Sequence, residues 1–362
     1  MSIYEKTYDP VLIFDYAHTI EPIKLYNINN TKNQSTVQKL RCAAEVHRQT
    51  RNMIRNKIKT GVKYYDICKM LENNVINLFG KDDLTAGRGF PTGFSVNNIA
   101  AHDSAYPNDN RVVKKDDVIK IDFGTHVDGY IIDSAFTHTS SNKFDNLIAA
   151  TKEGTWTGIK SAGPDAYIPD ISSAIKETIE SYSIELNGKT YDIKPIYGLG
   201  GHNILRNNVH GGKIILARPD YPKSYLEDHA KCRMKADEIY AIETFASTGT
   251  GNISFSNQPI THYMMNQNYE KVDFSLASTK IIYNWIKTNR GTLPFCTRWI
   301  YDSLYSKIGE RYKLGINELV KNKVITGYPA LEDVVGSYTS QMEHTIYLHE
   351  NGKEILSYGD DY

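Results

Sequence analysis

Residues 120–133 read KIDFGTHVDGYIID and place carboxylates inside apolar sequence. On either side of the centre, residues 118–123 and 130–136 are rich in β-branched and aromatic side chains. Gly124 and Gly129 bracket the connection between these two segments. This pattern predicts two strands joined by a tight turn.

Asp122 and Asp133 are the unusual members of these strands. A hairpin that is symmetric about the bond between residues 127 and 128 pairs them directly, with Cβ atoms about 4.5–5.5 Å apart on one face. Two carboxylates this close in an apolar setting repel each other, and both charges persist only beside a cation. The alternative is that one carboxylate is protonated, and the pair alone does not decide between the two.

Composition sets broad limits on the class of protein. The 362 residues suffice for one large or two ordinary domains, and the 42 acidic and 42 basic residues give no support to a nucleic-acid-binding protein. The four cysteines form no C-x-x-C pair, so we expect free thiols in a reducing compartment. The first residues lack the apolar core of a signal peptide, and no apolar run is long enough to span a membrane. We therefore expect a cytoplasmic protein.

Helical and extended patterns alternate along the chain. Residues 1–35 form a polar N-terminal extension. Thr36 is a candidate cap for the first helix, and residues 90–93 predict a turn before a short strand that carries His102. Apolar spacing predicts helices at about 36–59, 64–78, from 143, 168–182, 278–287 and 295–308. Residues 256–328, which contain the last two of these, form a candidate inserted subdomain.

Two later strands carry acids. Residues 239–245 contain Glu243, and residues 337–348 contain Glu343. One face of the second strand is polar, and solvent exposure of that face is an alternative to a site. Residues 114–122 resemble 235–243 at an offset of 121, and each segment ends in an acid. This weak repeat suggests two α+β halves related by a pseudo-two-fold axis, with acids gathered at their interface.

The candidate metal ligands are Asp122, Asp133, His202, Glu243 and Glu343. Four carboxylates balance the charge of two divalent ions, and oxygen-rich ligands with one histidine favour manganese, iron or cobalt, and less specifically zinc. Two such ions lower the pKa of a shared water and supply a nucleophile near neutral pH. A phosphate-binding loop at 197–202 is the competing interpretation of the glycines there, but neither common phosphate-loop motif is present.

Five blocks, in order, resemble the methionine aminopeptidase family, type 2: residues 90–102, 121–133, 201–202, 240–245 and 336–345. The resemblance extends over about residues 36–362. It implies an α/β (α+β) pita-bread fold with two pseudo-symmetric halves, a catalytic domain at 36–362 and a type-2 helical insertion at 256–328. It also implies removal of the N-terminal methionine from nascent polypeptides, by hydrolysis with a hydroxide that bridges two divalent ions (Mn²⁺, Co²⁺, Fe²⁺ or Zn²⁺).

The resemblance also implies roles for individual residues. Asp122, Asp133 and Glu343 would hold one ion, and Asp133, Glu343, His202 and Glu243 the other. Glu243 would take a proton from the water. His102 would contact the scissile amide and would be the residue that fumagillin-type inhibitors alkylate, and His210 would stabilise the developing oxyanion. The residues implied to border the methionine pocket are Phe90, Val209, Phe245, His262 and Tyr328.

Two features depart from the family pattern. Type 2 members usually have asparagine where Gly200 stands, which removes one hydrogen bond from the pocket wall. Eukaryotic members usually carry a long charged N-terminal extension that is missing here, so transient association of this expected monomer with the ribosome would need another surface. The alternatives are a same-fold binding protein without catalysis, which would have lost metal ligands, and an aminopeptidase P or prolidase, which usually has a large additional N-terminal domain.

Overall fold

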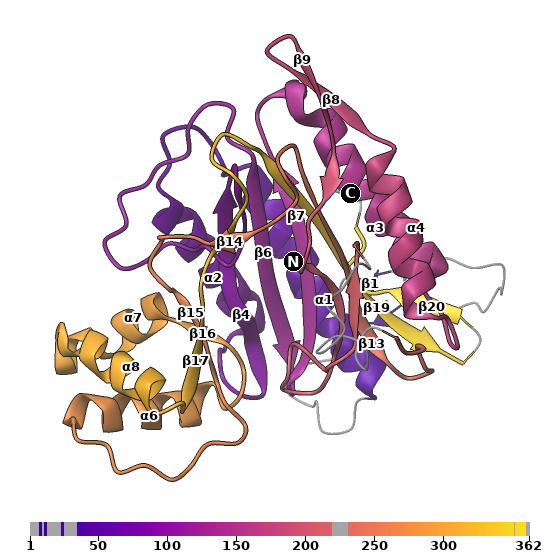
Figure 1. Ribbon diagram of the computed structural model, residues 1–362. Coiled ribbons are helices and arrows are strands. Elements are labelled where there is room, and N and C mark those ends of the chain that lie inside the picture. Colours follow the sequence, from indigo (N-terminus) through magenta and orange to yellow (C-terminus); the bar gives the residue numbers. More distant parts are fainter. Residues whose placement is uncertain are drawn as a thin grey trace.

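The computed structural model describes residues 35–218, 231–350 and 352–359, together with the short strands 7–8, 11–12 and 23–24. It confirms a mixed α/β chain, in which two sheet-and-helix halves lie side by side and a smaller lobe projects from one of them (Figure 1). No helix in this described part is long and apolar enough to cross a membrane. The helices are α1 (Thr36–Arg55), α2 (Tyr64–Phe79), α3 (Asp145–Ser161), α4 (Ile168–Glu180), α6 (Ala277–Asn289), α7 (Thr297–Ile308) and α8 (Arg311–Lys321), with a 3₁₀ turn η3 at Asn142–Phe144.

The first half is a three-stranded antiparallel sheet covered by α1 and α2. Its strands run in the order β4 (Ala86–Val96), β6 (Ile119–Val127) and β7 (Tyr130–His138). The Ser35 side chain accepts a hydrogen bond from the backbone N–H of Gln38, and the Gln38 side chain accepts one from the backbone N–H of Ser35, so α1 begins in a capping box. Apolar side chains of α1, α2 and the sheet form one continuous core.

The second half is a larger antiparallel sheet covered by α3 and α4. The strand order is β12 (Ile214–Leu216), β11 (Gly200–Ile204), β13 (Ile239–Ser247), β19 (Thr339–His349), β20 (Gly352–Ile355) and β2 (Val11–Leu12), and β10 (Lys194–Pro195) also pairs with β13. A second core lies between this sheet and its helices. Because β2 pairs with β20, part of the expected N-terminal extension belongs to this sheet, whereas most of residues 1–34 lies outside the described residues.

Backbone hydrogen bonds repeat between the halves and support the internal repeat. The turn before β6 and the turn before β13 each contain an aspartate with positive φ, Asp116 at 64° and Asp237 at 63°. Each turn is also closed by an acid that accepts the N–H three residues before it. The strand segment before each turn bonds the start of a helix in the same way. The matching pairs are Tyr64 N–Arg111 O with Ile168 N–Cys232 O, and Val113 N–Val62 O with Met234 N–Ala166 O.

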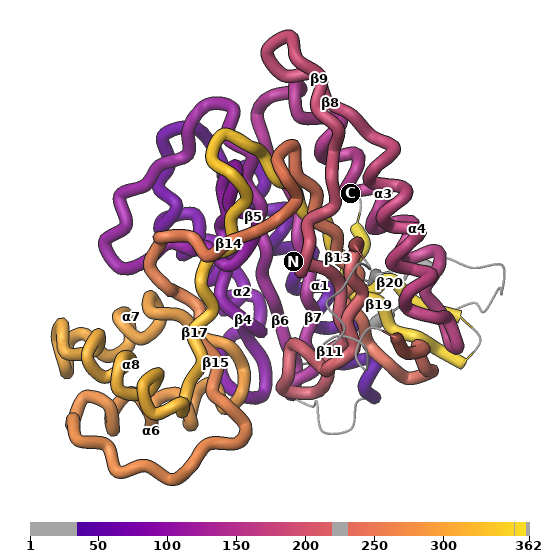
Figure 2. The backbone as a smooth tube through the Cα atoms, viewed as in Figure 1, coloured from indigo at the N-terminus to yellow at the C-terminus, as the bar shows by residue number. Residues whose placement is uncertain are grey.

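The inserted segment 256–328 folds around its own core, formed by α6, α7, α8 and a small sheet. It is the orange lobe beside β4 in Figure 1, and the tube in Figure 2 shows the chain leaving and returning close to that strand. Its sheet has the order β16 (Phe295–Cys296), β15 (His262–Met265) and β17 (Ile325–Tyr328). The remaining small sheets are β14 (Ser254–Phe255)–β18 (Leu331–Glu332)–β5 (Ile99–Ala101), β8 (Ser183–Leu186)–β9 (Lys189–Asp192) and β1 (Thr7–Tyr8)–β3 (Ile23–Lys24).

Several sequence-based boundaries are wrong. The cap of α1 is Ser35 rather than Thr36, and the helix ends at Arg55 rather than at about residue 59. Residues 90–93 are not a turn, because β4 continues through them with a local register shift against β6. Residues 295–296 are extended, so α7 begins later than predicted, and α8 was not among the predicted helices.

A buried ion pair attaches the inserted lobe to the first half. Arg298 at the start of α7 donates to Glu72 Oε1 of α2 at 2.5 Å, and the indole N–H of Trp299 donates to Oε2 at 2.9 Å. The backbone N–H of Thr92 on β4 also donates to Glu72, at 3.3 Å. The guanidinium of Arg88 lies 3.8 Å above the Trp299 ring. Glu72 therefore connects helix, sheet and lobe at one point.

We predict that Glu72→Gln lowers the free energy of unfolding by about 3–5 kcal/mol, because it leaves the buried Arg298 charge without its partner. Urea unfolding followed by circular dichroism measures the change. Glu180→Gln is the matched control: its partner Lys176 is on the same helix and both side chains are partly exposed, so a change below about 1 kcal/mol is expected. Equal effects of the two substitutions would contradict the account.

Candidate active site

Asp122 and Asp133 share one face of the β6–β7 hairpin, but they are not direct partners. Asp133 pairs with Gly124, and Asp122 pairs with Ala135. The two acids are therefore diagonal neighbours, and the predicted symmetric register is wrong by two residues, since Asp122 pairs with Ala135 instead of Asp133. They remain on the same face because Asp122 and Gly124 are two residues apart.

The turn explains the register. Asp128 and Gly129 form a two-residue connection with φ of 50° and 77°, the conformation of a type I′ turn. The hairpin is thus centred between these two residues rather than between 127 and 128. Gly124 has a separate role, because a Cβ there would lie 2.3 Å from the ring of Phe90, a pocket residue on β4.

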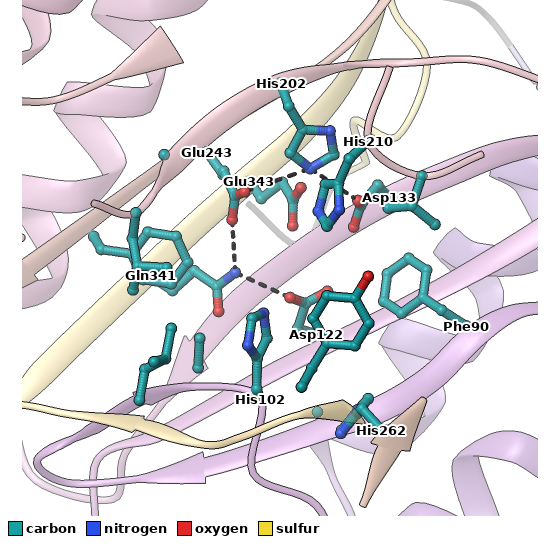
Figure 3. A pocket seen from close by; sticks show the side chains of 18 of the residues that line it. Phe90, His102, Asp122, Asp133, His202, His210, Glu243, His262, Gln341 and Glu343 are labelled. Atoms are coloured by element: carbon teal, nitrogen blue, oxygen red, sulfur yellow. Dashed lines mark hydrogen bonds and ion pairs between the residues drawn. The ribbon is translucent and has the colours of Figure 1, made fainter. Parts of the chain in front are cut away.

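The second half contributes three further candidate ligands. Glu243 on β13 and Glu343 on β19 are direct cross-strand partners, and His202 on β11 pairs with Ala241. All of β19 is buried apart from His349, so the alternative of a solvated polar face is wrong. The two halves meet face to face there, and the carboxylates of one approach those of the other (Figure 3).

The donor atoms fall into two overlapping groups. Within each group, one ligand atom per residue lies within 4.8 Å of the others. His202 Nε2 is 3.6 Å from both Asp133 Oδ2 and Glu243 Oε1, too far for a hydrogen bond. Ligands bound at about 2.0–2.2 Å to one ion lie at comparable separations from each other. The groups are Asp133–His202–Glu343 and Asp122–Glu243–Glu343, with Glu343 common to both.

The electrostatics of the cluster favour cations. Burial raises the pKa of Asp122 to about 7. Burial, and then repulsion from neighbouring carboxylates, raises the pKa of Asp133, Glu243 and Glu343 well above the usual range. Asp122 Oδ1 and both carboxylate oxygens of Glu343 are buried without a hydrogen-bond partner among the described residues. An acid-rich cluster with unused oxygen donors fits divalent metal ions.

His202 is arranged to offer a nitrogen lone pair. Burial lowers the pKa of its ring well below the usual value, so the imidazole is neutral. Nδ1 lies 3.4 Å from the carbonyl oxygen of Asn203, a weak contact in which the Nδ1 proton points at the backbone. Nε2 is then free to face Asp133 and Glu243, as expected of a metal-binding histidine with its other nitrogen held.

Hydroxyl groups connect the two halves beside the cluster. Thr345 on β19 receives the N–H of Asp133 at 2.8 Å and donates to its carbonyl at 2.6 Å. Ser134 on β7 donates to the carbonyl of Glu343 at 2.8 Å. These bonds join strands of different sheets at the positions of Asp133 and Glu343, and so fix the separation of the two carboxylates that the resemblance implies to be shared between ions.

All the predicted site residues line one cavity of about 530 Å³, which opens beside the cluster. His102 follows β5 with φ of 65°, and its ring lies 6.0 Å from that of Tyr328 and 6.5 Å from that of His262. The His210 ring lies edge-on to His202 at 4.4 Å between centroids. Phe90, Val209 and Phe245 are also in the lining. The inserted lobe contributes His262 and Tyr328 to the cavity wall, so the shape of the cavity depends on how the lobe packs against the first half.

Sequence reasoning missed Gln341 and Lys120, which also line the cavity. Both lie two residues from a candidate ligand on the same strand, and that period-2 spacing was the available signal. The structure also explains Gly200, because a Cβ there would lie 2.3 Å from the carbonyl oxygen of Ile215. Strand β12 thus packs directly on the glycine backbone, and Leu216 takes part in the pocket wall.

The fold and donor set define a metallopeptidase. A family model described as "Metallopeptidase family M24" matches residues 38–263. Curated relatives named "Methionine aminopeptidase 2" include proteins from Clavispora lusitaniae, 43% identical over 90% of this chain and 72% of the relative, and Podospora anserina, 42% identical over 93% and 74%. The chain belongs to metallopeptidase family M24 and, within it, to the methionine aminopeptidases of type 2.

Solved structures support the fold alone, since their sequences are much less similar. A thermophilic Arx1 has a TM-score of 0.72 at 19% identity, covering 89% of this chain and 90% of that one. The methionine aminopeptidase of Thermotoga maritima has a TM-score of 0.58 at 19% identity, with coverage of 91% and 99%. The X-Pro aminopeptidase of the same organism has a TM-score of 0.53 at 15% identity, covering 91% of this chain and 63% of that one. The pita-bread prediction is confirmed.

We predict that Asp122→Asn makes the metal-free protein increasingly more stable than wild type as the pH rises from about 4 to about 7. The pKa of Asp122 is raised in the folded state, so the wild type loses stability as this proton leaves, and the variant does not. The upper limit of the difference is roughly 4 kcal/mol, at about 1.4 kcal/mol per pKa unit.

The measurement is urea unfolding of both proteins in chelator at several pH values. Both proteins contain the same buried histidines, such as His262, whose lowered pKa of about 3 makes stability rise with pH. Their contribution to the pH dependence therefore cancels in the difference between the two proteins. A stability difference that does not vary with pH would contradict the assignment.

Proposed function

We propose that this protein removes the N-terminal methionine from polypeptides by hydrolysis, with two divalent ions held by the cluster. The observation that carries the proposal is the pair of donor groups that share Glu343 at the wall of a cavity large enough for a methionine side chain. The intact donor set argues against a same-fold binding protein without catalysis. The 43% identity to a methionine aminopeptidase 2 argues against an X-Pro hydrolase.

The ligands divide between the two ions as the resemblance implies. One ion would be held by Asp122, Asp133 and Glu343, and the other by Asp133, Glu343, His202 and Glu243. Glu243 belongs to the donor group of Asp122, but its Oε1 also lies 3.6 Å from His202 Nε2. When bound, such ions supply Lewis acidity and activate water near neutral pH, and Mn²⁺, Co²⁺, Fe²⁺ and Zn²⁺ are all compatible with the donors.

Three residues of the chain itself handle protons and charge. Glu243 accepts a proton from the attacking water, since its Oε1 lies at the cluster. His102 contacts the scissile amide and the leaving amine, and His210 stabilises the oxyanion. Burial lowers the pKa of His102 to about 4, so its ring is neutral and can accept or donate a hydrogen bond.

The methionine side chain enters between the first half and the inserted lobe. Phe90 and Val209 come from the halves, whereas His262 and Tyr328 come from the lobe, and Phe245 borders the cavity from β13. An apolar pocket of this kind separates methionine from longer or branched side chains by only about 1–3 kcal/mol. We also propose a monomeric, cytoplasmic protein, for which ribosome association is open to test.

The function is tested with Met-Ala-Ser and Pro-Ala-Ser tripeptides, after chelation and after adding back Mn²⁺ or Co²⁺. We expect metal-dependent release of methionine and no release of proline. Glu343→Gln should abolish turnover, because it removes the ligand common to both groups. Release of proline in preference to methionine would identify an X-Pro hydrolase, and inactivity with every metal would revive the binding-protein alternative.

A second prediction concerns His102. We expect His102→Ala to bind metal like wild type, lose most of its activity and become insensitive to fumagillin-type epoxides, because the imidazole that the epoxide would alkylate is removed. Intact-mass spectrometry after incubation with the epoxide measures the adduct directly. His262→Ala is the control and should still be alkylated. Equal alkylation of His102→Ala and wild type would contradict the role of His102.

A further inference from the structure

Gln341 is buried beside the cluster, with 1% of its surface exposed, and its amide nitrogen contacts two candidate ligands at once. Nε2 donates to Asp122 Oδ2 and to Glu243 Oε2, each at 3.1 Å (Figure 3, dashed lines). An amide NH₂ has two protons, and both are used here. The two acceptors come from different halves of the fold, β6 and β13, so one side chain ties the halves together at the site.

These bonds occupy one oxygen of each carboxylate and leave the other for the cluster. Glu243 Oε1 lies 3.6 Å from Nε2 of His202, a member of the other donor group. Asp122 Oδ1 is buried without a hydrogen-bond partner among the described residues. The terminal torsion of a carboxylate is soft, so an unheld Asp or Glu samples many orientations. Gln341 restricts that torsion in both acids.

The backbone of Gln341 is itself fixed. Its N–H donates to Thr137 Oγ1 at 2.8 Å, and the Thr137 hydroxyl donates back to its carbonyl at 2.8 Å. Gln341 pairs with Phe245 on β13, two residues along from the Glu243–Glu343 pair, and so it shares their face of the sheet. A neutral donor also suits the location: a lysine would compete with metal ions, and a glutamate would add a fifth negative charge.

We propose that Gln341 is a positioning residue that orients Asp122 and Glu243 for metal binding. The proposal rests on the two-ion site proposed above. It differs from a purely structural role, in which Gln341 would stabilise the fold without changing the affinity for metal. Neighbours that orient metal ligands typically contribute 10–100-fold to metal affinity.

The test compares wild type with Gln341→Met, which keeps the length of the side chain and removes both N–H donors. Mn²⁺ affinity is measured by calorimetry, and the coordination geometry by the visible absorption of the Co²⁺-loaded protein. We expect the dissociation constant for Mn²⁺ to rise 10–100-fold and the Co²⁺ bands to change. The Mn²⁺ concentration needed for half-maximal tripeptide cleavage should rise equally.

Thr155→Val is the matched control. The Thr155 hydroxyl on α3 lies 2.9 Å from both the backbone carbonyl oxygen of Met342 and Thr244 Oγ1 on β13, so the variant loosens β19 and its neighbour β13 without touching a ligand. It should bind Mn²⁺ like wild type. Gln341→Asn, which keeps the amide but is too short to reach both carboxylates, is the second variant and should also weaken Mn²⁺ binding. It keeps the test possible if Gln341→Met fails to fold.

Wild-type Mn²⁺ affinity and an unchanged Co²⁺ spectrum in a folded Gln341→Met or Gln341→Asn protein would overturn the positioning role while leaving the two-ion site intact. Equal weakening in Thr155→Val would also overturn it, because the effect would then come from β19 as a whole. A wild type that binds no Mn²⁺ would overturn the two-ion site, and the positioning role with it.

Discussion

Four clustered carboxylates, of which Asp133 and Glu343 are buried and Asp122 and Glu243 partly buried, are the constraint on which this structure depends. Burial, and then repulsion from neighbouring acids, raises the pKa of Asp133, Glu243 and Glu343 well above the usual range. Without cations the cluster can persist only by holding protons. Repulsion among the carboxylates is therefore unfavourable in the metal-free protein, and bound metal ions would replace it with attraction. The surrounding fold must hold the acids together in the absence of metal.

The internal repeat supplies that restraint. Each half places acids on a central strand through the same turn and the same helix-to-strand hydrogen bonds, and the hydroxyls of Ser134 and Thr345 then join β7 to β19. The ion pair of Glu72 with Arg298 attaches the inserted lobe to the first half, and the lobe completes the cavity with His262 and Tyr328. The acid cluster thus lies at the junction of the two halves, and the inserted lobe lines the cavity beside it.

The sequence predicts the strands that carry the acids, because their apolar composition and bracketing glycines are local signals. It does not predict how those strands meet. The direct pairing of Glu243 with Glu343 joins residues 100 positions apart, for which no local pattern exists. The Asp-Gly pair at 128–129 is a local signal for the hairpin register, because this dipeptide favours a type I′ turn. The polar face of β19 is buried because the opposite half covers it, a tertiary effect that periodicity cannot report. The individual roles of the site residues came from family resemblance.

The most direct test of the account is the number and proximity of metal ions in the loaded protein. Elemental analysis and electron paramagnetic resonance of the Mn²⁺ form address both. The account predicts two Mn²⁺ ions per chain with the spectrum of a coupled pair, since ions that share Asp133 and Glu343 would lie roughly 3.5–4 Å apart. A single uncoupled Mn²⁺ per chain, or none, would contradict it.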